Sequence, residues 1–251
     1  MIKAILVGAC GKMGNNICEC AKQDNDIKIV AGIDKINTGK DFPVFSNFND
    51  IKMQADVIID FSNVALLDSI LEYALENKTP VILATTGYSE AQIEKIKNAS
   101  KSIPVFFTFN MSIGVNLLCS LAKKAADILG DGFDIEIIEK HHNQKIDAPS
   151  GTAIMLANAI NGVFDDKLDY EYDRHSKRAK RPKNEIGIHS VRGGTIVGEH
   201  DVIFAGCDEV ITLSHQAQSK QVFAVGALRA AKFIFEKPAG LYDMNDIMNF
   251  N

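Results

Sequence analysis

The chain has 251 residues and a formal net charge of −5, and its apolar and charged fractions are those of an ordinary folded protein. This length suits one large domain or two modest ones, and the negative charge disfavours general binding to nucleic acid or to an anionic membrane. Because no apolar run reaches the roughly 20 residues that a spanning helix needs, and the five cysteines form no CxxC pair or metal-like cluster, we expect no membrane partner, no bound metal and a reduced, cytoplasmic protein.

The first half of the chain alternates short apolar runs with helix-like segments. Buried-strand patterns occupy residues 2–7, 27–33, 56–62, 80–84 and 104–109, and helical patterns occupy 12–22, 64–76 and 90–100. Such alternation is typical of a parallel sheet that helices cover on both faces. We therefore predict an α/β fold whose first part is a Rossmann-like parallel-sheet domain.

The pattern changes near Asn110. A long amphipathic helix is predicted over 113–129, and an alternating strand over 133–139. Further strand patterns lie at 187–192, 196–205 and 209–216, with turn residues at Gly193-Gly194 and Cys207-Asp208 between them. We expect these last three strands to be antiparallel neighbours.

A strong helical pattern at 221–236 stops before Pro238 and is expected to return to the first domain. We accordingly predict a dinucleotide-binding domain from 1–111 plus 223–251. Residues 112–222 would form a second, mixed α+β domain for substrate binding and oligomerisation.

A glycine-rich loop joins the first strand to the first helix. Gly8, Gly11 and Gly14 have the spacing GxxGxxG, which alone is a weak signal and is compatible with a plain tight turn. Between a strand and a helix, however, such glycines let the backbone approach a pyrophosphate whose charge is met by the start of the helix. This position therefore predicts a nicotinamide dinucleotide.

Asp34 ends the second predicted strand about twenty residues after the glycines. An acid at this place can accept the ribose hydroxyls of NADH, whereas the adjacent Lys35 can neutralise the 2′-phosphate of NADPH. The pair predicts use of both cofactors without ranking them, and a solvated loop is the alternative.

Two further turns begin at the carboxyl ends of predicted parallel strands. They are Ala84-Thr85-Thr86-Gly87 and Thr108-Phe109-Asn110-Met111. Ligands of open α/β sheets bind at this edge, so both turns are expected to flank the nicotinamide half of the cofactor unless they only cap the next helix.

The loop 165–185 is rich in basic residues in its second half. A nucleic-acid patch is one interpretation, but a solvated loop near an anionic substrate is favoured.

The segment 139–152 concentrates groups that handle protons and anions. His141, His142 and Lys145 follow a predicted strand, and a Pro-Ser-Gly-Thr turn at 149–152 then opens a helix. Histidine and lysine bind carboxylates and transfer protons, and the helix start forms a second anion site. Together they suit a small dicarboxylate. The histidines as metal ligands, a plain serine cap and a serine nucleophile are alternatives, although the GxSxG pattern is absent.

These motifs resemble the dihydrodipicolinate reductase (4-hydroxy-tetrahydrodipicolinate reductase) family nearly end to end. The resemblance is carried by residues 7–14, 56–62, 84–87, 110–116, 141–153, 191–194 and 197–200. The segment 141–153 (HHNQKIDAPSGTA) is highly specific to this family, whereas the glycine loop is not.

The resemblance implies hydride transfer from NADH or NADPH to a cyclic dicarboxylate in lysine (diaminopimelate) biosynthesis, with tetrahydrodipicolinate as product, by a homotetramer. It implies that His141 is the general acid/base and Lys145 the proton donor. Substrate contacts are expected from His142, Ser150, Gly151 and Thr152. Cofactor contacts are expected from Gly8, Ala9, Cys10, Gly11, Lys12, Met13, Asp34, Lys35, Ala84, Thr85, Thr86, Thr108, Phe109, Asn110 and Met111.

The chain departs from the family pattern at three places. Asn143-Gln144 replaces a frequent Arg-His, Ala84 replaces a frequent glycine, and Ser219-Lys220 replaces a frequent Ser-Arg, which loses a bidentate fork if that side chain binds a carboxylate. None removes a predicted catalytic group. Another two-domain NAD(P) oxidoreductase, acting on an amino acid or a sugar, and a cofactor-binding protein without catalysis are the competing hypotheses.

Overall fold

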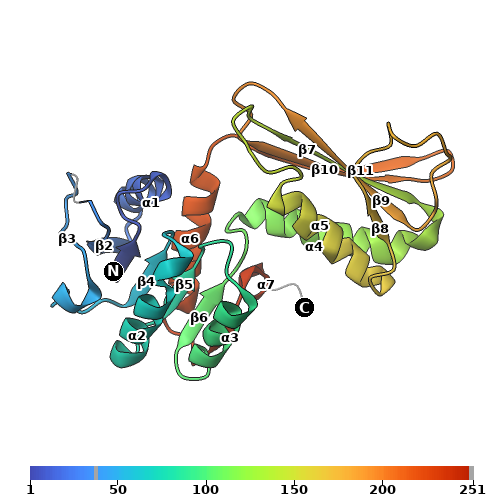
Figure 1. Ribbon diagram of the computed structural model, residues 1–251. Helices are drawn as coiled ribbons and strands as arrows, with labels where there is room; N and C mark the ends of the chain where they lie inside the picture. The colour runs from blue at the N-terminus through green and yellow to red at the C-terminus, as the bar shows by residue number, and fades with distance from the viewer. Residues whose placement is uncertain (37–38, 249–251) are drawn as a thin grey trace. The chain divides into compact units, whose positions relative to one another are not determined.

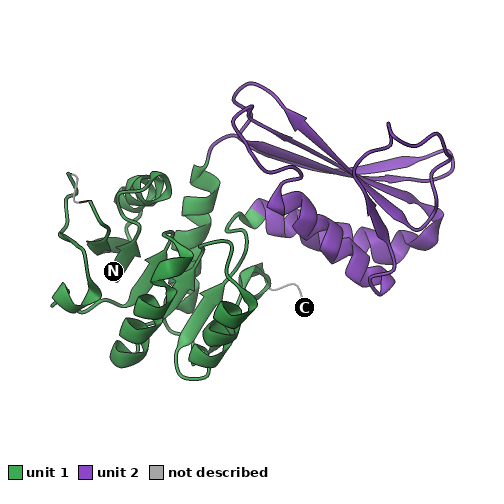
Figure 2. Cartoon of the chain, viewed as in Figure 1, with its two compact units in different colours: residues 1–113, 220–251 green, residues 114–219 purple. Residues whose placement is uncertain are grey.

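A computed structural model describes residues 1–36 and 39–248, so residues 37–38 and 249–251, which fall within the predicted first domain, lie outside the described residues. The chain divides into two compact units (Figure 2). Unit 1 comprises residues 1–113 and 220–251, and unit 2 comprises residues 114–219. In the part of the chain described, no helix has the length and apolarity needed to cross a membrane.

Unit 1 contains a seven-stranded sheet in the order β12-β6-β5-β4-β1-β2-β3, in which every pair is parallel. The strands are β1 (Ile2–Val7), β2 (Ile27–Ile33), β3 (Val44–Phe45), β4 (Val57–Asp60), β5 (Val81–Leu83), β6 (Pro104–Phe107) and β12 (Gly240–Tyr242). The Rossmann-like parallel sheet predicted from the sequence is confirmed. The two edge strands, β3 and β12, were not predicted, because two or three residues carry no periodicity.

Helices cover both faces of this sheet (Figure 1). The helices of unit 1 are α1 (Lys12–Lys22), α2 (Leu67–Asn77), α3 (Glu90–Ala99), α6 (Gln221–Ile234) and α7 (Met244–Met248). Alternate residues of β1 enter different apolar clusters: Ala4 and Leu6 pack with α1 and α6, whereas Ile5 and Val7 pack with α2 and α3. Because both faces are buried, the strand sequence is continuously apolar.

Unit 2 contains a five-stranded mixed sheet in the order β11-β10-β7-β9-β8. Its strands are β7 (Asp134–His141), β8 (Asp169–Glu171), β9 (Glu185–Arg192), β10 (Gly198–Ala205) and β11 (Val210–Ala217). Strand β7 is antiparallel to β10 and parallel to β9. The mixed α+β architecture predicted for the second part of the chain is confirmed, although the parallel pairing of β7 with β9 was not predicted.

The predicted strand neighbours in unit 2 were partly wrong. Strands β10 and β11 are antiparallel neighbours as expected, but β7 lies between β9 and β10. The Gly193-Gly194 turn is therefore no hairpin. Its backbone is bonded instead to the end of β7, with Gly193 N donating to His141 O at 2.9 Å and Asn143 N donating to Gly194 O at 3.3 Å.

One face of the unit 2 sheet is packed against helices α4 (Ile113–Leu129) and α5 (Gly151–Asn161) (Figure 1). From β7, Ile135 and Ile137 enter this core. Since alternate residues of a strand share a face, Glu139 and His141 continue the same row toward the end of the strand. The apolar alternation of β7 thus brings a carboxylate and an imidazole to the edge of the core, where α5 begins.

Candidate functional site

The glycine loop between β1 and α1 depends on two close backbone approaches. Gly8 has a φ of 78°, and a Cβ there would lie 2.8 Å from Phe61 O. At Gly14, a Cβ would lie 2.2 Å from Gly8 O and 2.6 Å from Ala9 O. Side chains are excluded at both positions, so the loop folds tightly against the amino end of α1.

The amino end of α1 is suited to an anion. Gly11 is its N-cap and makes no side-chain hydrogen bond, and no acidic residue lies in the first turn. The exposed Lys12 instead adds positive charge at the positive end of the helix dipole, which costs about 0.3–1 kcal/mol in an isolated helix. A bound pyrophosphate would relieve this repulsion. It would also accept hydrogen bonds from the N–H groups at the start of the helix, so these residues fit the predicted dinucleotide.

Asp34 lies beside this loop, directly after β2. Its carboxylate accepts hydrogen bonds from Cys10 N at 2.8 Å and from Lys35 N at 2.7 Å. An ionised carboxylate has about four acceptor positions, so Asp34 can orient the loop and still receive a ribose hydroxyl. Lys35 itself is exposed.

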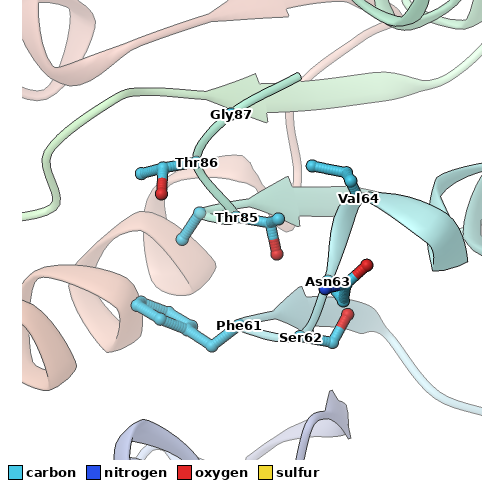
Figure 3. Close-up of a pocket in the computed structure, with 8 residues that line it drawn as sticks. Phe61, Ser62, Asn63, Val64, Thr85, Thr86 and Gly87 are labelled. Atoms are coloured by element: carbon cyan, nitrogen blue, oxygen red, sulfur yellow. The ribbon is translucent and has the colours of Figure 1, made fainter. Parts of the chain in front are cut away.

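A hollow of about 320 Å³ opens at the carboxyl ends of β4 and β5 (Figure 3). Its lining residues are Phe61, Ser62, Asn63, Val64, Ala84, Thr85, Thr86 and Gly87. The first predicted turn is therefore brought to this hollow, together with the residues that follow β4, which were not predicted as contacts. Phe61 also lies next to the glycine loop, because its carbonyl oxygen is the atom that a Cβ at Gly8 would meet.

Beneath the hollow, Asp60 ties the two turns together. This fully buried carboxylate accepts hydrogen bonds from Thr85 Oγ1 at 2.8 Å, Tyr88 OH at 3.2 Å, Ser62 N at 3.0 Å and Ser62 Oγ. Burial raises the pKa of Asp60, although these hydrogen bonds oppose the rise. Sequence reasoning assigned no role to Asp60; a lone acid that ends an apolar strand was the available signal.

The second predicted turn follows β6 and is held by its own polar groups. Thr108 Oγ1 donates to Asn110 O at 3.1 Å, and Ser112 N donates to Asn110 Oδ1 at 2.8 Å. Phe109 is 59% exposed, whereas Met111 is 2% exposed and belongs to the apolar core. Any contact from Met111 to a cofactor would therefore use its main chain.

In unit 2, His141 is held by a buried carboxylate. His141 Nδ1 lies 2.6 Å from Glu139 Oε2, and Arg192 from β9 meets both oxygens of Glu139 at 2.7 and 2.6 Å. Burial disfavours the ionised carboxylate, but hydrogen bonds from Arg192, Ser190 and His141 lower the pKa of Glu139 to about 2. Burial also lowers the pKa of His141, and Glu139 counteracts that shift.

Ser150 connects this pair to the start of α5. Its hydroxyl accepts from Ala153 N at 3.1 Å as the N-cap of α5 and lies 2.9 Å from His200 Nε2, while its amide donates to Glu139 Oε1 at 3.1 Å. The Ser150 side chain is buried and committed to these contacts. Gly151 is exposed and Thr152 half-exposed at the same helix start, a part of a helix that favours anions such as a carboxylate.

Lys145 lies in the turn after β7. Its ammonium pairs with Asp147 at 2.8 and 2.9 Å, and its amide donates to His142 O at 3.1 Å. The lysine also acts on His141, whose pKa its positive charge lowers. The two predicted proton-handling groups thus interact electrostatically, while His142 is half-buried just beyond the end of β7.

Glu139, Arg192 and His200 were quoted in the sequence motifs but received no role there. His200 is 4% exposed on β10, opposite Glu139 in the sheet register, and its ring centroid lies 5.2 Å from that of His141. The sequence signal for Glu139 was its spacing of two residues from His141, which places both side chains on the same face of one strand. Arg192 and His200 could be linked to His141 only through the strand order.

The basic loop is partly neutralised by acidic residues of its own unit. Arg181 pairs with Asp134 at 2.8 Å and with Glu136 at 3.0 Å, while Arg174 bonds to Glu185 and Lys177 to Glu171. Three of its cations therefore hold the loop to the sheet. Within residues 1–36 and 39–248, no group of three or more His, Cys, Asp or Glu side chains could hold a metal ion.

The buried His200, whose ring lies next to that of His141, makes the stability of unit 2 sensitive to acid. Burial lowers the pKa of His200 from 6.5 to about 4, so the unfolded chain binds its proton first as the pH falls. The stability associated with neutral His200 is present above pH 6.5 and is lost toward pH 4, a change on the order of 3 kcal/mol.

Urea unfolding of the full chain between pH 7 and 4 should therefore show a falling unfolding free energy, and His200→Gln should make the slope shallower. An identical slope in wild type and variant would contradict this assignment.

Comparison with known proteins covers both units. A family model described as "Dihydrodipicolinate reductase, N-terminus" matches residues 2–111, and one described as "Dihydrodipicolinate reductase, C-terminus" matches residues 114–248. The 4-hydroxy-tetrahydrodipicolinate reductase of Caldanaerobacter subterraneus subsp. tengcongensis is 53% identical over 248 residues, which cover 99% of this chain and 98% of that protein. The Clostridium tetani protein of the same name is 52% identical over 250 residues, with the same coverage.

Solved structures agree with the sequence comparisons. A dipicolinate-bound dihydrodipicolinate reductase from Paenisporosarcina sp. TG-14 has a TM-score of 0.81 and 26% identity, with 97% of both chains covered. An aspartate dehydrogenase from Thermotoga maritima, at 12% identity and a TM-score of 0.54 over 95% of this chain and 98% of its own, shares the fold alone. The resemblance predicted from the motifs is confirmed: the chain belongs to the dihydrodipicolinate reductase family.

Proposed function

We propose that this protein reduces 4-hydroxy-tetrahydrodipicolinate to tetrahydrodipicolinate with NADH or NADPH, in the biosynthesis of diaminopimelate and lysine. The observation that carries the proposal is the cluster in unit 2, where His141, held by buried Glu139, interacts with Lys145 and lies next to the start of α5. Family membership supports the same reaction, as does the start of α1 in unit 1, which has no side-chain cap and no acidic residue in its first turn.

The cofactor would be bound by unit 1, and a reduced nicotinamide would supply the hydride. The tight loop and the amides at the start of α1 would receive the pyrophosphate, and Asp34 or Lys35 the adenosine ribose and its 2′ substituent. Ala84–Thr86 and Thr108–Met111 would flank the nicotinamide half. The hollow next to Asp60 supports the placement of Ala84–Thr86, since this turn forms part of its wall and Thr85 is bonded to Asp60.

The substrate would be bound by unit 2 through its two carboxylates. The amides of Gly151 and Thr152 at the start of α5 and the His142 ring would donate hydrogen bonds to the carboxylates, and the Lys145 ammonium would supply positive charge. Asp147 keeps the ammonium in place at 2.8 Å, and its own pKa is lowered by that pairing. Lys145 would give a proton to the substrate atom that becomes electron-rich, and His141 would act as the general acid/base beside it.

We also propose a homotetramer in the cytoplasm. Helices α4 and α5 cover only one face of the unit 2 sheet (Figure 1). Val191 and Val210, which by register lie on the other face, are 45% and 64% exposed. This face suits pairing with a second copy, and sedimentation velocity would give the number of subunits. The five free cysteines fit a reducing compartment.

The proposed activity is tested by the initial rate of NADH and NADPH oxidation, followed by the loss of reduced-nicotinamide absorbance. The substrate is generated in place by condensation of pyruvate and aspartate semialdehyde with the preceding synthase. Turnover that requires both precursors supports the proposal. A folded protein that binds cofactor but oxidises none of it would contradict the proposal and favour another substrate or a binding role.

Lys35 gives a prediction about cofactor use. In Lys35→Ala, kcat/KM for NADPH should fall roughly five- to tenfold and that for NADH should change little, because only NADPH carries a 2′-phosphate for the exposed ammonium. Lys28→Ala, at an exposed lysine of β2, is the matched control. Equal losses with both cofactors would show that Lys35 does not contact the 2′-phosphate.

A further inference from the structure

We infer that Glu139, clamped by Arg192, is a positioning residue that keeps the proton of neutral His141 on Nδ1, so that Nε2 is the atom that exchanges protons with the substrate. The inference deepens the proposed function and rests on it for the role of His141. Neither Glu139 nor Arg192 would touch the substrate; both act through the imidazole.

The contacts leave Glu139 no freedom to turn. Its Oε1 accepts from Arg192 Nη2 at 2.6 Å and from Ser150 N at 3.1 Å. Its Oε2 accepts from Arg192 Nη1 at 2.7 Å and lies 2.6 Å from His141 Nδ1. Arg192 Nη2 also donates to Asp147 O at 2.8 Å. The carboxylate is thus fixed from β9, from the start of α5 and from its own strand.

The protonation of Glu139 decides which imidazole nitrogen donates. The pKa of this buried carboxylate is about 2, since its hydrogen bonds outweigh the effect of burial, so it is ionised near neutral pH. An ionised carboxylate only accepts hydrogen bonds. His141 must therefore donate through Nδ1, and neutral His141 has its lone pair on Nε2.

Arg192 also prevents Glu139 from making His141 too basic. The groups that act on His141 are Glu139 on its own strand, Arg192 on β9, Lys145 in the following turn and the His200 ring on β10. Burial lowers the pKa of His141 first, Glu139 raises it, and the two cations lower it again. The carboxylate therefore orients the ring without holding it protonated.

Gly198 leaves room for the other ring nitrogen of His141, Nε2. Gly198 of β10 lies across from His141, and a Cβ built on it would be 3.0 Å from Nε2 and 3.4 Å from Cδ2 of the ring. A methyl group would press on the nitrogen that is to exchange protons. Gly198→Ala should accordingly turn the ring and reduce turnover even though Glu139 remains.

The test measures the tautomer of the His141 ring directly. Long-range ¹H–¹⁵N spectra of the full chain without ligands, with the His141 signals assigned by their loss in His141→Gln, should show the tautomer protonated on Nδ1. This readout needs no substrate. Absence of turnover by wild type would contradict the proposed function, whereas an Nε2-protonated His141 in wild type would overturn this inference.

Glu139→Gln then tests the consequence for the reaction. The neutral amide should lower the pKa of His141 further, move the His141-dependent limb of the kcat–pH profile to lower pH, and reduce kcat roughly 100-fold. The matched control is Glu136→Gln, because Glu136 lies on the other face of β7 and likewise contacts a histidine and an arginine, His189 at 2.7 Å and Arg181 at 3.0 Å.

The control should leave the ring signals and the pH profile of His141 unchanged. An unchanged profile in Glu139→Gln as well would overturn the inference. If Glu139→Gln fails to fold, the wild-type spectrum still decides the tautomer.

Discussion

Replacing Lys145 by alanine is expected to lower kcat roughly 10²- to 10⁴-fold, the range associated with loss of a positioned proton donor, while the affinity for NADH and NADPH stays that of wild type. Lys145 belongs to unit 2, and its side chain is only 20% exposed. The variant also leaves Asp147 without its cation and should therefore weaken binding of an anionic substrate.

The matched control is Lys167→Ala. Lys167 forms the same kind of pair with an aspartate two residues away, Asp165 at 2.8 Å, but its side chain is 73% exposed. An exposed pair contributes little to stability, so this variant should behave as wild type. Cofactor affinity measured by fluorescence separates binding from chemistry. A Lys145→Ala variant with unchanged kcat would remove the lysine from proton transfer and leave His141 as the donor.

Replacing Gly14 by alanine is expected to weaken cofactor binding strongly, with a dissociation constant for NADH raised on the order of 100-fold. The added methyl would meet Gly8 O at 2.2 Å and Ala9 O at 2.6 Å. Both are backbone atoms in the loop that would hold the pyrophosphate, so they can move only by opening that loop. The accompanying loss of stability should be about 1–3 kcal/mol, as for other overpacked sites.

Gly162→Ala provides the control for the loss of a glycine. Gly162 has helical torsion angles, φ −59° and ψ −22°, and apart from its chain neighbours and its own helix no heavy atom lies within 4 Å of the position that a Cβ would take. Alanine there should be neutral or stabilise the fold by about 0.4–1 kcal/mol. Calorimetric titration with NADH measures the binding of both variants. Wild-type affinity in Gly14→Ala would mean that the loop does not bind the pyrophosphate.

Where a segment is bounded by strong local signals, the sequence predicted it closely. β1 and α1 have the predicted bounds, because an apolar run ends at Gly8 and the helix begins directly after Gly11. β4 is shorter than the predicted 56–62, since Ser62 bonds back to the carboxylate of Asp60 and turns the chain. Such a turn depends on one side-chain contact and is not visible in the apolar pattern.

The order of the strands in unit 2 could not be predicted in the same way. Gly193-Gly194 has the composition of a hairpin turn, but β9 pairs with β7 in parallel, and a parallel pair is encoded by no local pattern. The partners of His141 depend on that order. Arg192 meets Glu139 only because β9 runs beside β7, so its role became apparent with the register.

Unit 1 is discontinuous in sequence, and this bears on the order in which a growing chain can fold. Ala224, Ala227 and Ala231 of α6 complete the apolar cluster on one face of its sheet, and β12 completes its edge. During synthesis these segments leave the ribosome after the whole of unit 2. The nascent chain can therefore finish the later unit first, while the earlier one exposes the face that α6 will cover, the circumstance in which chaperones are most needed.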